Sequence, residues 1–213
     1  MIHKKVMQKN LERKDTGQKD VLQWNMMQKK EVQKNVICGA IFDLDGVLLD
    51  SMAVWNDLGV RYLQKCGIQP EAGLSQILFS MSMEQGADYL KAKYQLSDTP
   101  QEILNGIEQM IRDFYFYEVQ PKEGARELLQ FLQDQAVKMI AATSSPREHV
   151  TKALQRNGLY DYLQQIYTTG EVGVSKHEPV IYQLAANSLG TKPEETLVFE
   201  DSLYALKTAK NAG

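Results

Sequence analysis

The most informative part of this 213-residue chain runs Ile41-Phe42-Asp43-Leu44-Asp45-Gly46-Val47-Leu48-Leu49-Asp50-Ser51. An apolar strand is expected to end before the first aspartate, and a glycine turn follows the second. Residues i and i+2 of a strand point to the same side, so Asp43 and Asp45 can face one reacting atom beyond the strand's carboxyl end. Open α/β sheets bind their ligands at that edge.

Two other structures also place aspartates and a glycine in such a pattern. One is a turn in which the carboxylates bond their own backbone, and the other is a calcium-binding loop. Position 12 of a calcium loop would fall on Val54 instead of glutamate, which excludes that structure. The turn stays open as the alternative to a catalytic pair.

The composition is that of a globular protein, because 43% of the residues are hydrophobic and the net charge is only −3. A chain of this length can form one hydrophobic core, or one core and a small second domain. No apolar run approaches the roughly 18 residues that span a bilayer, and the N-terminus lacks a signal-peptide hydrophobic region. A soluble cytoplasmic protein without a membrane partner is expected. Cys38 and Cys66 fit no metal-ligand spacing and are expected to stay reduced.

Residues 1–35 differ from the rest, with nine basic against four acidic residues, compared with 15 against 23 over residues 36–213. The segment is rich in Lys, Gln and Asn without sustained helical periodicity, which predicts a basic, polar, disordered extension. A start site at Met26 or Met27 would also explain it. An arm that binds nucleic acid is the more specific alternative. The basic residues are not interspersed with aromatic residues or enriched in arginine, however, so no nucleic-acid partner is expected.

Short apolar runs alternate with helical stretches over the remaining chain, which predicts a parallel sheet in an α/β fold. The runs are Val36 to Phe42, Val137 to Thr143, Gln165 to Thr168 and Thr196 to Phe199. Residues 36–50 and 120–213 are therefore expected to form one catalytic core.

About 95 residues separate the first two runs, several times the length of a simple crossover. Two apolar stripes at helical spacing predict a helical cap over residues 51–119, hinged near Asp50 to Ala53 and near Gln120 to Gly124. The stripes, expected to be bundle core, are Trp55, Leu58, Tyr62 and Leu63, and Ile103, Leu104, Ile107, Met110, Ile111 and Phe114.

The second run ends in a cluster of hydroxyls, Thr143-Ser144-Ser145-Pro146, just before a predicted helix. Hydroxyls and free backbone amides at such a place suit an oxygen-rich anion. Ser145 ahead of Pro146 fits a simple helix cap equally well.

Charged residues follow the third and fourth runs. Lys176 is either a solvated surface charge or a fixed cation for a phosphoryl group. Glu200 and Asp201 come directly after the fourth run, and adjacent acids near other acids need a cation between them. Oxygen-only ligands without His or Cys favour Mg²⁺.

These four motifs, in this order, resemble those of the haloacid dehalogenase-like hydrolase superfamily, and more narrowly its beta-phosphoglucomutase-like phosphatases. The resemblance covers residues 36–213 and implies a Rossmann-like parallel sheet, with four of the usual five core strands present, and an inserted all-helical cap. It implies that Asp43 is the nucleophile, forming an aspartyl-phosphate, and Asp45 the general acid and base. Gly46, Thr143, Ser144 and Lys176 would bind the phosphoryl group, and Asp43, the carbonyl of Asp45, Glu200 and Asp201 would hold Mg²⁺.

The resemblance thus implies a Mg²⁺-dependent phosphatase acting on a small phosphorylated metabolite such as a sugar phosphate. A phosphomutase is the alternative, although residues 79–86 lack the basic residue that such mutases place there. The chain departs from the family in the pair His177-Glu178 before Pro179, and it ends at Gly213 where relatives continue into a fifth strand. An inactive phosphate-binding protein is therefore a third interpretation. The protein is expected to be a monomer that can associate through an exposed sheet edge.

Overall fold

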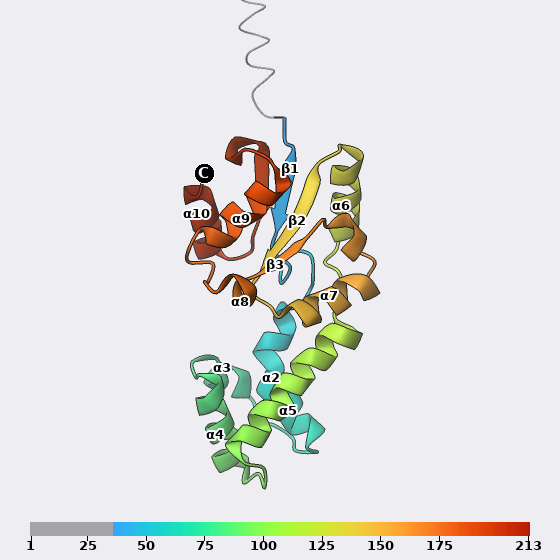
Figure 1. Ribbon diagram of the computed structural model, residues 1–213. Coiled ribbons are helices and arrows are strands. Elements are labelled where there is room, and N and C mark those ends of the chain that lie inside the picture. Colours follow the sequence, from blue (N-terminus) through green and yellow to red (C-terminus); the bar gives the residue numbers. More distant parts are fainter. Residues whose placement is uncertain (1–35) are drawn as a thin grey trace, which may run out of the picture. The chain divides into compact units, whose positions relative to one another are not determined.

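The fold is seen in a computed structural model that describes residues 36–213 (Figure 1). The predicted basic extension, residues 1–35, lies outside the described residues. Residues Cys38–Gly213 pack as one compact unit. No helix among the described residues has both the length and the apolar character that a membrane crossing requires.

The centre of the fold is a parallel sheet of four strands, β1 (Gly39–Phe42), β2 (Lys138–Thr143), β3 (Ile166–Thr168) and β4 (Thr196–Phe199). Their order is β3-β2-β1-β4, with Phe42 beside both Ala141 and Phe199. All four predicted strands are confirmed, although β1 begins at Gly39 instead of Val36. Because the strands are parallel, the residues that follow them meet at one edge.

Helices cover both faces of the sheet (Figure 1). On one side lie α6 (Ala125–Asp134) and α7 (Arg147–Arg156), and on the other lie α9 (Val180–Leu189) and α10 (Leu203–Asn211). This division follows from right-handed crossovers, because the chain moves from β1 to β3 in one direction and returns to β4 in the other. Short turns, α8 (Thr169–Val172), η2 (Tyr160–Tyr162) and η3 (Pro193–Glu195), complete this part.

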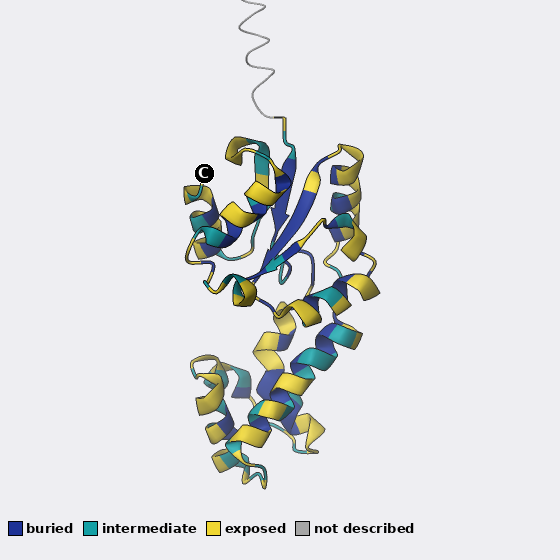
Figure 2. Cartoon of the chain, in the orientation of Figure 1, coloured by how far each residue is buried: buried dark blue, intermediate teal, exposed yellow. Residues whose placement is uncertain are grey.

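The core of the sheet region is apolar on both faces. Figure 2 shows β1 and β2 buried along nearly their whole length. On the α9 side the buried cluster consists of Ile41, Ile140, Ala142, Ile181, Tyr182, Ala185, Leu189 and Ala209. One face of α6 and one of α7 are buried too, and α9 begins after Pro179 and ends at Leu189, with Gly190 as its C-cap.

A helical insert, residues 51–119, follows the first strand and contains α2 (Met52–Lys65), α3 (Leu74–Phe79), α4 (Met83–Tyr94) and α5 (Pro100–Asp113). A π-helical turn, η1 (Phe114–Glu118), continues α5. Capping boxes start two of these helices, with Ser82 paired to Gln85 and Thr99 to Glu102. The division of the chain into a core and a separate cap stays a prediction.

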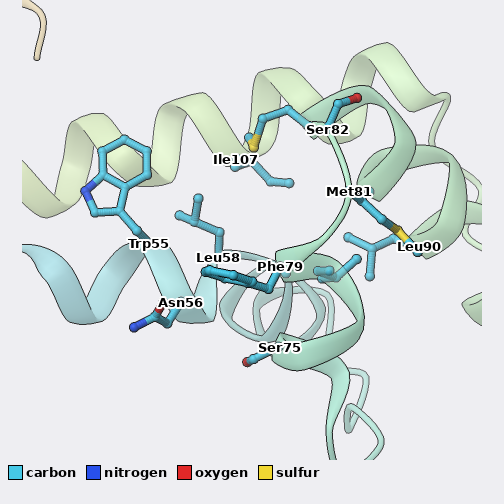
Figure 3. Close-up of a pocket in the computed structure, with 13 residues that line it drawn as sticks. Trp55, Asn56, Leu58, Ser75, Phe79, Met81, Ser82, Leu90 and Ile107 are labelled. Carbon is cyan, nitrogen blue, oxygen red and sulfur yellow. The ribbon is translucent and has the colours of Figure 1, made fainter. Parts of the chain in front are cut away.

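The predicted core stripes of the insert are mostly buried, and the exception is Trp55. Its side chain is 41% exposed, so the prediction that it forms bundle core is wrong. The reason is that Trp55 borders two hollows instead of the packed contact between α2 and α5. Figure 3 shows one of them, an apolar pocket of about 90 Å³ between Trp55, Leu58, Phe79 and Ile107.

Two connections join the insert to the sheet region, and they pair with each other. The Asp50 amide donates to the carbonyl of Gln120 (2.9 Å), and the Lys122 amide donates to the carbonyl of Leu48 (3.0 Å). These are the segments predicted to hinge, and that motion stays a prediction. Among the described residues β4 is an edge strand, and association through this edge also stays a prediction.

Candidate active site

Asp43 is the first residue after β1. Its amide donates to the carbonyl of Phe199 (2.9 Å), and its Oδ1 accepts from the Leu44 amide (2.8 Å). The strand ends at Phe42, so the alternation of side chains within a strand does not extend to Asp45. Whether the two carboxylates face one atom therefore stays a prediction.

Gly46 allows the turn after Asp43 to lie against Asp201. Its φ is +75°, and a Cβ at this position would lie 2.2 Å from Oδ2 of Asp201. Any other residue would be strained and would displace that carboxylate. Gly46 thus brings the first and fourth motifs together, which sequence spacing alone did not show.

Lys176 is buried between two acids. Its Nζ lies 2.8 Å from Oδ1 of Asp43 and 2.6 Å from Oε1 of Glu200, and its side chain is only 3% exposed. The alternative of a solvated surface lysine is therefore wrong. The hydroxyl of Tyr182 also donates to Oε1 of Glu200 (2.6 Å), so one carboxylate oxygen has two donors.

The surroundings of Asp43 raise the pKa of its carboxyl group to about 7. Burial is the main cause and the charge of Glu200 adds to it, while Lys176 acts in the opposite direction. Burial and the bond to Glu200 also raise the pKa of Tyr182, which keeps its hydroxyl protonated. Three carboxyl groups, those of Asp43, Glu200 and Asp201, thus meet in this cluster, and Lys176 lies between two of them.

The carboxylates of Asp43, Glu200 and Asp201 fit a divalent cation. Each offers one oxygen, and these oxygens all lie within 4.8 Å of one another. Oε2 of Glu200 is buried and has no hydrogen-bond partner among the described residues, as expected for an atom that binds a cation. An all-oxygen, carboxylate-rich set suits Mg²⁺.

The carboxylate of Asp45 is held by three hydroxyls instead of joining this cluster. Ser51 and Tyr115 donate to its Oδ1 at 2.6 Å each, and Ser145 donates to Oδ2 at 2.5 Å. The sequence prediction assigned the carbonyl of Asp45, not its carboxylate, to the cation, and that role stays a prediction.

Sequence reasoning missed these three hydroxyl donors. Ser51 lies in the same motif as Asp45, and its proximity was a usable signal. The alternative that Ser145 caps the following helix is wrong, because the N-cap of α7 is Pro146 and no side chain bonds there. For Tyr115, one of four consecutive aromatic residues in the insert, the sequence offers no signal.

The hydroxyl cluster after β2 lies at the same sheet edge. Thr143 is fully buried, and its Oγ1 accepts from the Ser145 amide (3.1 Å), whereas Ser144 is exposed. The amide of Ser144 and the Thr143 hydroxyl are thus placed beside a turn that leads into α7. Their predicted contact with a phosphoryl group stays a prediction.

A hollow of about 470 Å³ adjoins the Asp45 side of the site. Tyr115, which donates to Asp45, forms part of its wall, together with Trp55, Arg112 and His149. The rings of Tyr115 and His149 stack with their centres 5.5 Å apart. This volume lies within the range of small-molecule sites.

The chain is similar in sequence and fold to known proteins. The family described as haloacid dehalogenase-like hydrolase matches residues 40–213. The phosphorylated carbohydrates phosphatase of Thermotoga maritima is 27% identical over 173 residues, 81% of this chain and 80% of its own length. A crystal structure of a proposed beta-phosphoglucomutase from Thermotoga maritima has a TM-score of 0.73 and 28% identity, covering 82% of this chain and 81% of that one.

A further solved structure contains the expected metal. The proposed HAD-hydrolase YfnB from Bacillus subtilis, bound to magnesium, has a TM-score of 0.66 and 19% identity, covering 82% of this chain and 85% of that one. That likeness shows the fold alone. The family match, in contrast, includes the helical insert, all the residues of the carboxylate cluster and the four strands apart from Gly39, the first residue of β1. This chain is therefore a member of the haloacid dehalogenase-like hydrolase family.

Proposed function

We propose that this hydrolase is a Mg²⁺-dependent phosphatase that cleaves a small phosphate monoester, with sugar phosphates as the candidate class. The observation that carries the proposal is the cluster of Asp43, Glu200 and Asp201 around one small volume, with Lys176 bound to Asp43. The phosphorylated carbohydrates phosphatase among the relatives supports the substrate class.

In the proposed first step, the carboxylate of Asp43 attacks phosphorus and the bond to the ester oxygen breaks, which leaves an aspartyl-phosphate. Both reactants are anionic, so positive charge must offset their repulsion. Lys176 supplies one such charge within 2.8 Å of Asp43. A bound Mg²⁺ would supply the remaining charge and orient the phosphoryl oxygens.

Asp45 is proposed to carry the proton in both steps. It would protonate the departing alkoxide, and then deprotonate the water that releases phosphate from Asp43. Its carboxylate needs a fixed direction for this, and the hydroxyls of Ser51, Tyr115 and Ser145 supply it. Tyr115 and Ser51 belong to the insert, so the orientation of Asp45 depends on where the insert lies.

The leaving group is proposed to occupy the 470 Å³ hollow beside Tyr115. Trp55 offers a flat, partly exposed surface there, and Arg112 and His149 offer polar atoms. A sugar ring has both an apolar face and hydroxyls, and it would match such a wall.

The test is phosphate release from a panel of phosphate monoesters, with and without Mg²⁺. We expect Mg²⁺-dependent release by the wild-type chain and none by Asp43→Asn. An isomerised sugar phosphate in place of free phosphate would identify a phosphomutase. Binding of phosphate esters without any turnover would instead favour the phosphate-binding interpretation and refute the phosphatase.

A further inference from the structure

Glu200 has an uneven set of partners. Its side chain is 1% exposed, and both of its donors, Lys176 Nζ and the Tyr182 hydroxyl, bind the same oxygen, Oε1, at 2.6 Å. The other oxygen, Oε2, is buried without a hydrogen-bond partner among the described residues. A buried carboxylate oxygen without a donor is costly, so the arrangement calls for a ligand at Oε2.

One donor would not keep the two oxygens in these places. The last torsion of a glutamate side chain is broad, so the carboxylate turns easily about its own axis. A lysine ammonium is a compact charge on a flexible stem and attracts either oxygen. A second donor on a rigid ring, bound to the same oxygen, removes this freedom.

The hydroxyl of Tyr182 is fixed by the core of the sheet region. Tyr182 lies in the first turn of α9, which follows Pro179, and its ring packs in the cluster that contains Ile41 and Ile140. The residue is only 3% exposed. Tyrosine combines an apolar body with a polar tip, so the ring packs under the sheet while the hydroxyl reaches Glu200.

We propose that Tyr182 is a positioning residue for the cation site: by holding Oε1 of Glu200, it keeps Oε2 available for the divalent cation. The proposal rests on the Mg²⁺ site of the proposed function, and it adds a residue that none of the four motifs contains. Tyr182 would touch neither the cation nor the substrate and would act only through Glu200.

The test compares two tyrosines that each lose one hydroxyl. Tyr182→Phe removes the bond to Glu200, and Tyr62→Phe is the matched control, because Tyr62 is buried to a similar extent and donates to Asp98 at 2.8 Å in the insert. Mg²⁺ binding to the metal-free proteins is measured by titration calorimetry. We expect the Kd for Mg²⁺ to rise about tenfold in Tyr182→Phe and less than about twofold in Tyr62→Phe.

Two further measurements separate positioning from a merely structural effect. At saturating Mg²⁺ the kcat of Tyr182→Phe with a phosphate ester should stay within about threefold of wild type, while the Mg²⁺ concentration for half-maximal rate rises with the Kd. In a Glu200→Gln background, where the partner is already altered, adding Tyr182→Phe should change the Kd by less than about twofold.

An unchanged Kd for Mg²⁺ in Tyr182→Phe would overturn the proposal. An equal rise of the Kd in Tyr62→Phe would do the same, and so would a tenfold rise on adding Tyr182→Phe to Glu200→Gln. If Tyr182→Phe does not fold, Mg²⁺ binding is compared between Glu200→Gln and wild type. An equal Kd in these two proteins would show that Mg²⁺ binding does not depend on Glu200 and would overturn the proposal. Failure of the proposed function is distinguishable, because wild type would then bind Mg²⁺ in the calorimeter yet release no phosphate.

Discussion

Replacing Asp43 with asparagine should remove the nucleophile and yet stabilise the metal-free protein at neutral pH. Asparagine has nearly the shape of the neutral carboxyl group but cannot ionise. In the folded chain the Asp43 carboxyl is buried beside Glu200, and its pKa lies at about 7 instead of 3.8. The native structure therefore holds an ionised group that it would stabilise better if it were neutral.

The sign and size of the effect follow from proton linkage. Well below pH 3.8 the carboxyl is neutral in both folded and unfolded chains, so its contribution is fully favourable there. Between about pH 4 and pH 7 only the unfolded chain releases the proton, so wild-type stability falls as the pH rises. A difference of about 3 pH units corresponds to about 4 kcal/mol above pH 7, at about 1.36 kcal/mol for each unit.

The assay is urea denaturation followed by circular dichroism in EDTA at pH 4, 6 and 8. The free energy of unfolding of Asp43→Asn should match wild type at pH 4 and exceed it by up to about 4 kcal/mol at pH 8, equivalent to roughly 10 °C in Tm. Adding Mg²⁺ should stabilise wild type more than the variant. As a control, Asp50→Asn alters an exposed carboxyl of the same motif and should shift stability by less than about 0.5 kcal/mol.

The reasoning is refuted if Asp43→Asn is no more stable than wild type at pH 8 in EDTA. It is also refuted if the gap between the two proteins is the same at pH 4 and pH 8, because a titrating carboxyl cannot produce a constant difference. Phosphatase activity is measured in parallel and should fall by roughly a thousandfold or more.

Three further predictions concern residues around this centre. Lys176→Met leaves two buried acids without their cation, and urea denaturation in EDTA should show a loss of about 3–5 kcal/mol; a loss below about 1 kcal/mol would contradict the buried ion pairs. Tyr115→Phe removes one donor from Asp45, so kcat should fall roughly tenfold while inhibition by inorganic phosphate stays unchanged. An unaltered kcat would show that this hydroxyl does not serve the acid and base. Trp55→Ala should raise KM for phenyl phosphate several-fold but not for methyl phosphate, whose leaving group is too small to reach the hollow. A parallel rise for both esters would place the leaving group elsewhere.

The sheet could be predicted from the sequence because the pattern that indicates a strand is local. Each of the four runs is mostly apolar and is followed directly by a polar residue, and each became a strand within three residues of its predicted start. The helical insert was predicted for the same reason, since its stripes recur at helical spacing. Trp55 shows the limit of such predictions. A pattern predicts which face of a helix is apolar, but the packing of the other helices decides how much of that face is buried.

The candidate site was predicted in part. The predicted residues at the ends of strands or in the loops after them are Asp43, Lys176, Glu200 and Asp201. Parallel topology brings such positions to one edge of the sheet. Their arrangement into one cluster could therefore be inferred from order and spacing. The burial of Lys176 could not, because a lysine in a loop looks the same in sequence whether it is solvated or enclosed.

The sequence by itself determined the strands, the insert and the acids that follow the strands, because these depend on periodicity and on residues near one another in the chain. Only the tertiary structure decided which hydroxyls serve those acids. Tyr115 lies 70 residues from Asp45, Ser145 lies 100 residues from it, and Tyr182 lies 18 residues from Glu200. A hydroxyl this far along the chain from its acid carries no local signal, and its partner is fixed only when the packed core holds both side chains within 3 Å.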